Sequence, residues 1–190
     1  MRWRRWLLAA GCGAAAAGVG AWAFFRVWPL PPDVNHAQAQ AMLPTIEKFL
    51  DSRGGSYTGG MLAVNYPKLN SRTFCTAAII EIRRAGPRWR VGMVTWCEEY
   101  ARRGHSLVTG SGSIFNEVMV LAGAAGGDYR VVSAVGDSWA QDADPGWIDR
   151  HFSRGAAREI NSRGWPALPN PAVQARRAFG FPPGTPVVNI

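Results

Sequence analysis

Two β-prone runs decide the fold of this sequence: Phe74–Arg84 (FCTAAIIEIRR) and Trp89–Tyr100 (WRVGMVTWCEEY). Both contain β-branched and aromatic residues, and Ala85-Gly86-Pro87 stands between them. Such residues favour strands, whereas Gly and Pro in a short connection favour a tight turn. The stretch therefore predicts an antiparallel β-hairpin.

The same hairpin predicts a disulfide between Cys75 and Cys97. In an antiparallel hairpin, the residue numbers of paired positions have a constant sum. A turn centred on Gly86 makes this sum 172, which the two cysteines satisfy. Their Cβ atoms would then lie ~4.5–5.5 Å apart, close to the disulfide range. The alternative is two buried free thiols, and a register shifted by one residue would remove the opposition.

A second pair of strands is expected further along the chain. Ser113–Leu121 (SIFNEVMVL) and Tyr129–Val135 (YRVVSAV) are β-prone, and the segment that joins them contains Gly126-Gly127. The polar, glycine-rich stretch Arg102–Gly112 separates the two pairs and is expected to be a loop. Together the four strands predict a curved antiparallel sheet.

A helix is expected before the sheet. Asn35 can cap its N-terminus, and apolar residues recur three and four positions apart at Ala39, Met42, Leu43, Ile46, Phe49 and Leu50. Pro44 is expected to kink or divide this helix, and Gly54-Gly55 to end it. The residues that follow, Ser56–Arg72, are expected to form a loop with a short edge strand at Met61–Tyr66.

A second helix is expected after the sheet. Asp144 supplies a cap and Pro145 the first helical position, and one face is apolar at Ile148, Phe152, Ala156 and Ile160. After Gly164 the sequence is proline-rich and is expected to be irregular or disordered. This order predicts an α+β fold: a helix packed on a curved four-stranded antiparallel sheet, with a C-terminal helix.

Residues 1–28 have the pattern of a transmembrane signal-anchor. An uncharged apolar run, Trp6–Phe25, is preceded by three arginines and followed by Arg26. As a helix, such a run spans a hydrocarbon core of ~30 Å, and the arginine asymmetry predicts a cytoplasmic N-terminus. A linker at 29–34 then leads to the domain at 35–163 and to the tail at 164–190.

Two alternatives to the retained anchor stay open. Ala21-Trp22-Ala23 resembles a signal-peptide cleavage site, and Ala9-Ala10-Gly11-Cys12 resembles a lipobox. All three interpretations place the domain outside the cytoplasmic membrane, as a single-pass membrane protein, a secreted protein or a lipid-anchored protein. Export also supplies the oxidising compartment that a disulfide needs.

A lone anchor, a helix and a four-stranded meander resemble the cystatin-like and nuclear-transport-factor-2-like architectures of exported bacterial domains. The likeness covers residues 35–160. The stretch Cys75–Ser113, with WCEEY and with GSGS at Gly110–Ser113, also resembles uncharacterised exported proteins of Gram-positive bacteria. Some members of these architectures are subunits of secretion or conjugation machines, and some hold a small ligand between helix and sheet. A shared fold does not by itself fix a function.

The sequence contains no motif that is typical of catalysis, metal binding or cofactor binding. The GSGS stretch lacks the G-x-S-x-G spacing of a serine nucleophile, and the three histidines are isolated from one another. The adjacent Glu98 and Glu99 lie on a predicted strand, where their side chains point to opposite faces and cannot share a site. We therefore expect a protein that is not an enzyme and needs no metal or cofactor.

Two sets of residues are candidate binding surfaces. Four aromatic residues are a possible pocket lining, although such residues are more often plain core: Trp96, Tyr100, Phe115 and Tyr129. Four arginines around the hairpin turn are a possible basic patch for anionic lipid headgroups or cell-wall polymers, although such arginines often only aid solubility: Arg83, Arg84, Arg88 and Arg90.

The sequence favours a membrane-tethered extracytoplasmic interaction domain with a protein partner in the cell envelope. The net charge is +8, but only Lys48 and Lys68 are lysines, so we ascribe most of the excess to an arginine-rich composition and expect no nucleic-acid partner. The alternatives are a small-molecule pocket protein of the nuclear-transport-factor-2-like type and a surface that binds polyanions or anionic lipids.

Overall fold

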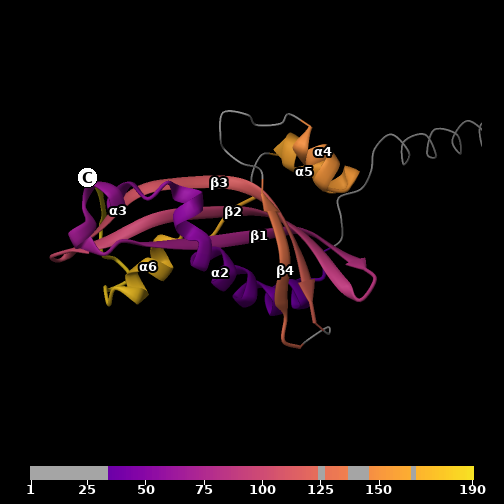
Figure 1. Cartoon of the computed structure of the whole chain (residues 1–190), viewed down its shortest axis with the longest axis horizontal. Helices are drawn as coiled ribbons and strands as arrows, with labels where there is room; N and C mark the ends of the chain where they lie inside the picture. Colours follow the sequence, from indigo (N-terminus) through magenta and orange to yellow (C-terminus); the bar gives the residue numbers. More distant parts are fainter. Residues whose placement is uncertain (1–33, 124–126, 137–145, 164–165) are drawn as a thin grey trace, which may run out of the picture. The chain divides into compact units, whose positions relative to one another are not determined.

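The computed structural model describes residues 34–123, 127–136, 146–163 and 166–190 (Figure 1). The predicted membrane segment 1–28 and almost all of the linker lie outside the described residues, as do Asp144 and Pro145. Among the described residues, no helix is both long enough and apolar enough to cross a membrane.

The described chain has an α+β fold with a mixed sheet of five strands. The helices are α2 (His36–Thr58), α3 (Met61–Asn65), α4 (Trp147–His151), α5 (Arg154–Arg163) and α6 (Ala172–Ala178), with a 3₁₀ turn at Pro67–Leu69. The strands are β1 (Arg72–Ala85), β2 (Arg88–Arg103), β3 (Ser106–Ala122), β4 (Arg130–Gly136) and β5 (Val187–Asn189).

Four strands form the antiparallel meander β1-β2-β3-β4, and β5 runs parallel to the beginning of β3. Because β5 comes from the tail that was expected to be irregular, the sheet is mixed rather than purely antiparallel. Strands β2 and β3 are joined by a two-residue turn at Gly104-His105. The prediction of a loop at Arg102–Gly112 is therefore wrong, since most of this stretch belongs to the two strands.

The β1–β2 hairpin and its disulfide are present, but the pairing differs from the predicted one. The turn consists of Gly86-Pro87, and Gly86 has a φ of 61°, which glycine adopts without strain. From this turn the numbers of paired residues sum to 173 rather than 172. A β-bulge at Ile80 then shifts the register by one residue and places Cys75 opposite Cys97. The two cysteines are bonded, with Cα atoms 4.1 Å apart.

Helix α2 continues past both predicted breaks. Asn35 caps its N-terminus as predicted, because its side chain accepts a backbone N–H at 3.0 Å. Pro44 lies inside the helix, which ends only at Thr58 and is followed by Gly59 with a φ of 72°. A left-handed glycine is a common end of a helix, so the terminator lies four residues later than expected.

Gly54 serves close packing rather than helix termination. It is buried, and an added Cβ would overlap the Cβ of Thr73 on β1. The glycine therefore lets α2 approach the sheet closely.

The predicted edge strand at Met61–Tyr66 is also wrong, because these residues form α3 and bury Leu62.

Side-chain alternation gives the sheet two buried faces. The face beneath α2 contains the disulfide and the larger apolar cluster: Met42, Ile46, Leu50, Cys75, Ala77, Val91, Met93, Cys97, Phe115, Met119, Leu121 and Tyr129. The opposite face packs against α4 and α5 through a second cluster: Ile80, Val94, Val118, Trp147, Phe152, Ala156, Ala157 and Ile160. Figure 1 shows α2 on one side of the strands and α4 with α5 on the other.

The predicted last helix is divided into α4 and α5. Phe152 between them has an extended backbone, and Ser153 caps α5 by accepting the Ala156 N–H at 3.3 Å. The Phe152 side chain is buried against Gly92 of β2, where an added Cβ would lie 2.5 Å from the ring. The predicted apolar face is thus buried across two helices, although Ile148 is only partly buried.

The proline-rich tail is folded, in contrast to the prediction. Helix α6 packs two small residues, Ala172 and Ala175, against Phe74, Tyr100 and Leu107. These strand residues alternate with those beneath α2, so α6 covers the same face as α4 and α5. The C-terminal tail is therefore part of the folded domain and adds to its core.

The disulfide should stabilise the domain mainly by restricting the unfolded chain. It joins residues separated by 22 positions, and a loop of that length corresponds to roughly 3 kcal/mol. Reduction, or Cys75→Ala together with Cys97→Ala, should lower the free energy of unfolding by about this amount in denaturant titrations. A reactive thiol at either position in the folded, oxidised protein would contradict the bond.

Replacing the ring between α4 and α5 should reveal how firmly these helices are docked. Phe152→Ala should cost on the order of 3–5 kcal/mol in unfolding free energy. Gly92→Ala should cost roughly 1–3 kcal/mol, because the new Cβ overlaps the ring. The double variant should lose less than the two single losses combined, since the missing ring makes room for the Cβ. An unchanged stability in Phe152→Ala would show that the helices are not docked.

Candidate functional site

Strand alternation divides the predicted basic patch between the two faces of the sheet. Arg84 pairs with Trp89, which lies beneath α2, and its guanidinium carbon is 4.4 Å from the centre of that ring. Arg83, Arg88 and Arg90 alternate with these two residues and therefore lie on the opposite face, the face of α4 and α5. The four arginines do not form a single patch.

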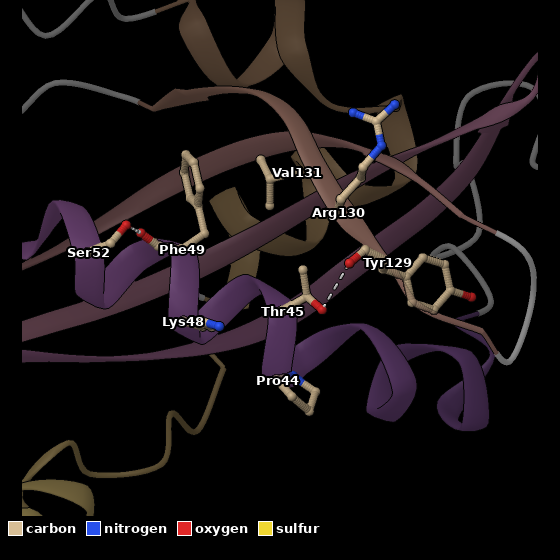
Figure 2. A pocket seen from close by; sticks show the side chains of 8 residues that line it. All are labelled: Pro44, Thr45, Lys48, Phe49, Ser52, Tyr129, Arg130 and Val131. Atoms are coloured by element: carbon tan, nitrogen blue, oxygen red, sulfur yellow. Dashed lines mark hydrogen bonds between the residues drawn. The ribbon is translucent and has the colours of Figure 1, made fainter.

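A fourth arginine, Arg130 on β4, lies on the same face as Arg83, Arg88 and Arg90. Arg88 pairs with Ala122, and Ala122 pairs with Arg130, so all three side chains lie on the same face. Figure 2 shows the Arg130 guanidinium directed away from α2. We call Arg83, Arg88, Arg90 and Arg130 the arginine face. Sequence reasoning missed Arg130 because its place depends on the register of two further strand pairs.

Two of these arginines are held by neighbouring groups. Arg83 Nη2 lies 3.1 Å from Oε1 of the fully buried Glu81. Arg90 Nη2 donates a hydrogen bond of 2.7 Å to the carbonyl oxygen of His151 at the end of α4. Because Arg83 and Arg90 stand directly opposite each other, like-charge repulsion would destabilise this pair. The two neighbouring oxygens reduce that repulsion and orient both side chains.

Among the described residues, Arg88 and Arg130 are the unpaired cations of the arginine face. Both are exposed, and their guanidinium groups form no hydrogen bond or ion pair with the residues that the structure describes. With Ala122 paired between them, their backbones are two strand spacings apart, roughly 10 Å. A guanidinium offers a planar fork of donors that fits carboxylate and phosphate. Each of the two can therefore bind an anionic group.

Three glutamates are buried: Glu81, which pairs with Arg83, and Glu99 and Glu117. Glu99 accepts backbone N–H groups of Leu62 at 2.7 Å and Ala63 at 2.8 Å, and thereby fixes α3. On the opposite face, Glu98 accepts the Tyr100 hydroxyl at 2.8 Å. The adjacent Glu98 and Glu99 thus belong to separate environments, as the strand geometry predicts.

Glu117 is a buried carboxyl group beneath α2. Its Oε1 accepts the Tyr57 hydroxyl at 3.1 Å, and its Oε2 has no hydrogen-bond partner among the described residues. Burial raises the pKa of Glu117 to about 7, against smaller lowering effects of Tyr57 and Arg53. Burial also raises the pKa of Tyr57 to about 12, and the charge of Glu117 adds to this shift. The folded protein therefore holds a proton on Glu117 at mildly acidic pH.

The four aromatic residues proposed for one pocket lie on different faces. Phe115 stacks on Tyr57 with ring centres 4.7 Å apart and shares the cluster beneath α2 with Tyr129. Tyr100 packs on the opposite face near α6, and Trp96 has the same alternation along β2. A single pocket lined by all four is therefore not formed.

A shallow groove between α2 and β4 includes Tyr129 (Figure 2). Its volume is ≈ 520 Å³, and it is lined by Pro44, Thr45, Lys48, Phe49, Ser52, Tyr129, Arg130 and Val131. Thr45 donates a hydrogen bond of 3.3 Å to the Tyr129 carbonyl and so joins the two walls. Figure 2 shows the Phe49 ring beside Val131, which gives the groove an apolar surface next to Lys48.

No group of three or more His, Cys, Asp or Glu residues that could hold a metal ion occurs within the described ranges. Comparison of the chain with protein-family models, curated proteins and solved structures found no match. The arginine face, the groove and Glu117 are therefore the features from which a function can be inferred.

The raised pKa of Glu117 predicts that stability falls as the pH rises. An unfolded glutamate ionises near pH 4.5, whereas folded Glu117 keeps its proton up to about pH 7. Ionising the buried Glu117 lowers the free energy of unfolding. This loss is absent below pH 4.5, grows between pH 4.5 and about pH 7, and is complete above that range, where it reaches roughly 3 kcal/mol. Glu117→Gln should remove this component of the pH dependence in unfolding titrations. Identical pH dependence in the wild type and the variant would contradict a buried, protonated Glu117.

Proposed function

We propose that the protein is a membrane-tethered interaction domain, without a catalytic role, that binds an anionic partner outside the cytoplasmic membrane. The observation that carries this proposal is the arginine face, where Arg88 and Arg130 are exposed without a counter-ion among the described residues. Exposed guanidinium groups bind carboxylates and phosphates through charge-assisted hydrogen bonds. An acidic envelope protein and an anionic lipid or polymer both offer this chemistry.

Two further features support a location outside the cytoplasm. Cys75 and Cys97 are fully buried and form a disulfide, which persists in oxidising compartments and is rare in the cytosol. The apolar run Trp6–Phe25 with its preceding arginines favours export of the part that follows.

A second candidate function is the binding of a small molecule in the groove between α2 and β4. The Phe49 ring and Val131 offer apolar contact, and Lys48 offers a cation for an acidic group on the ligand. Glu117 has the pKa of a useful general base. It is not among the residues that line the groove, however, so the groove and Glu117 do not form one reaction site.

Photo-crosslinking from the exposed Ala85, which pairs with Arg88 on the arginine face, tests the proposed function in cells. We expect an adduct in the wild type that is much weaker in Arg88→Glu with Arg130→Glu, because charge reversal repels an anion. The matched control carries Arg103→Glu with Arg177→Glu, two exposed arginines outside the arginine face.

Equal adduct yields in the wild type and both variants would contradict binding through this face.

The location is tested with a reporter fused after Ile190 that is active only outside the cytoplasmic membrane. Such a reporter should be active, whereas activity only of a cytoplasmic reporter would overturn the proposed location.

A further inference from the structure

The arginine face lies at the end of the sheet at which α2 begins. Thr45, in the first half of α2, bonds to the carbonyl of Tyr129, the residue before β4. At the other end of the helix, Thr58 approaches Thr73 at the beginning of β1, far along the strand from the β1–β2 turn. Figure 1 shows α2 running in this direction along the strands. The chain before Asn35 therefore joins the domain at the end that carries the arginine face.

The connection to the predicted membrane segment is short. Only residues 29–34 separate that segment from Asn35, and a stretch of this length spans at most roughly 20 Å when fully extended. A bilayer that holds residues 1–28 would therefore lie within that distance of the beginning of α2. Lipid headgroups would then be at a high local concentration near this end of the domain.

We propose that the arginine face binds the phosphate groups of anionic phospholipids on the outer surface of the membrane that holds the N-terminal segment. This inference rests on the proposed function and names its partner. Arg88 and Arg130 supply the unpaired guanidinium groups, and Arg90, whose acceptor is an uncharged carbonyl, adds positive potential beside them. Guanidinium groups pair with phosphate oxygens in a bidentate manner, and an anionic membrane surface attracts each nearby cation.

The shape of the arginine face favours a bilayer over a single acidic side chain or loop. One row across four strands contains Ala85, Arg88, Ala122 and Arg130, so small residues alternate with cations. The two unpaired arginines thus extend from strands two spacings apart on one face of the sheet. A planar array of separate negative charges matches this arrangement, and headgroup phosphates form such an array.

Chemical footprinting of arginine in the full-length protein tests the inference. The chain is reconstituted in lipid nanodiscs made with either an anionic or a zwitterionic phospholipid and treated with phenylglyoxal, which modifies exposed arginines. Modification is measured for each residue by mass spectrometry at low and at high salt. Arg103 and Arg177 are internal controls because they are exposed and do not belong to the arginine face.

We expect slower modification of Arg88 and Arg130 in anionic nanodiscs at low salt, with little change at the two control arginines. High salt should remove the protection, because it screens exposed charges. Arg88→Gln with Arg130→Gln should weaken the lipid-dependent protection of Arg83, whose side chain is partly exposed, by about 25-fold in binding constant, since each surface arginine contributes roughly fivefold. Arg103→Gln with Arg177→Gln should leave it unchanged.

Equal modification rates in the two lipids would overturn the inference, and so would equal slowing at the control arginines. Unprotected Arg88 and Arg130 in anionic nanodiscs, together with cellular crosslinks that depend on these residues, would assign the anionic partner to an acidic protein or a polymer. In that outcome the proposed function would stand and the lipid would be excluded as the ligand. Loss of the crosslinks themselves would instead count against the proposed function.

Discussion

The register of β1 against β2 is the constraint on which the rest of the structure depends. Side chains alternate between the two faces, so a shift of one residue moves each side chain of a strand to the opposite face. The bulge at Ile80 makes this shift inside the strand. If pairing were continuous from the turn, Cys75 would face Glu98 instead of Cys97. If it were continuous from the disulfide, Arg83 would point into the cluster beneath α2. One extra residue in β1 therefore allows both the disulfide and the position of Arg83 on the arginine face.

The predictable parts of the fold were those with a local sequence signal. The β-prone runs, the Asn35 cap and the apolar face around Phe152 each have such a signal, and each is found. The disulfide was predicted correctly because two errors cancel. The turn is centred between Gly86 and Pro87 rather than on Gly86, so residue numbers paired next to the turn sum to 173. The bulge at Ile80, which was not predicted, lowers this sum to 172 at the two cysteines. Nothing in FCTAAIIEIRR marks that bulge, since no glycine stands there. Helix α6 was not predicted, because it packs through Ala172 and Ala175. Two alanines in a proline-rich segment do not form a recognisable hydrophobic periodicity.

The candidate site was only partly predictable, for reasons of register. Three of the four arginines could be found from their positions around one turn, but the face that Arg83 occupies relative to the disulfide depends on the bulge in β1. Arg130 required the pairing of β3 with both neighbours, which local sequence does not specify. Likewise, the net charge of +8 was ascribed to composition, and composition cannot show that Glu81 and Glu117 are buried while Arg88 is exposed. The three buried glutamates leave the exposed surface of the described residues more basic than a count of residues indicates.

Glu81 links the arginine face to the helices that cover the sheet. Its Oε2 accepts the Ser153 N–H at 3.1 Å, and its Oε1 lies 3.1 Å from Arg83. Arg90 reaches the carbonyl of His151, two residues before Ser153. A buried carboxylate is costly unless both hydrogen bonds and an opposite charge compensate its lost hydration. If α4 and α5 leave the sheet, Glu81 loses its backbone donor and Arg90 loses its acceptor at the same time. The repulsion between Arg83 and Arg90 is then less compensated, so the docking of these helices and the geometry of the arginine face are energetically coupled.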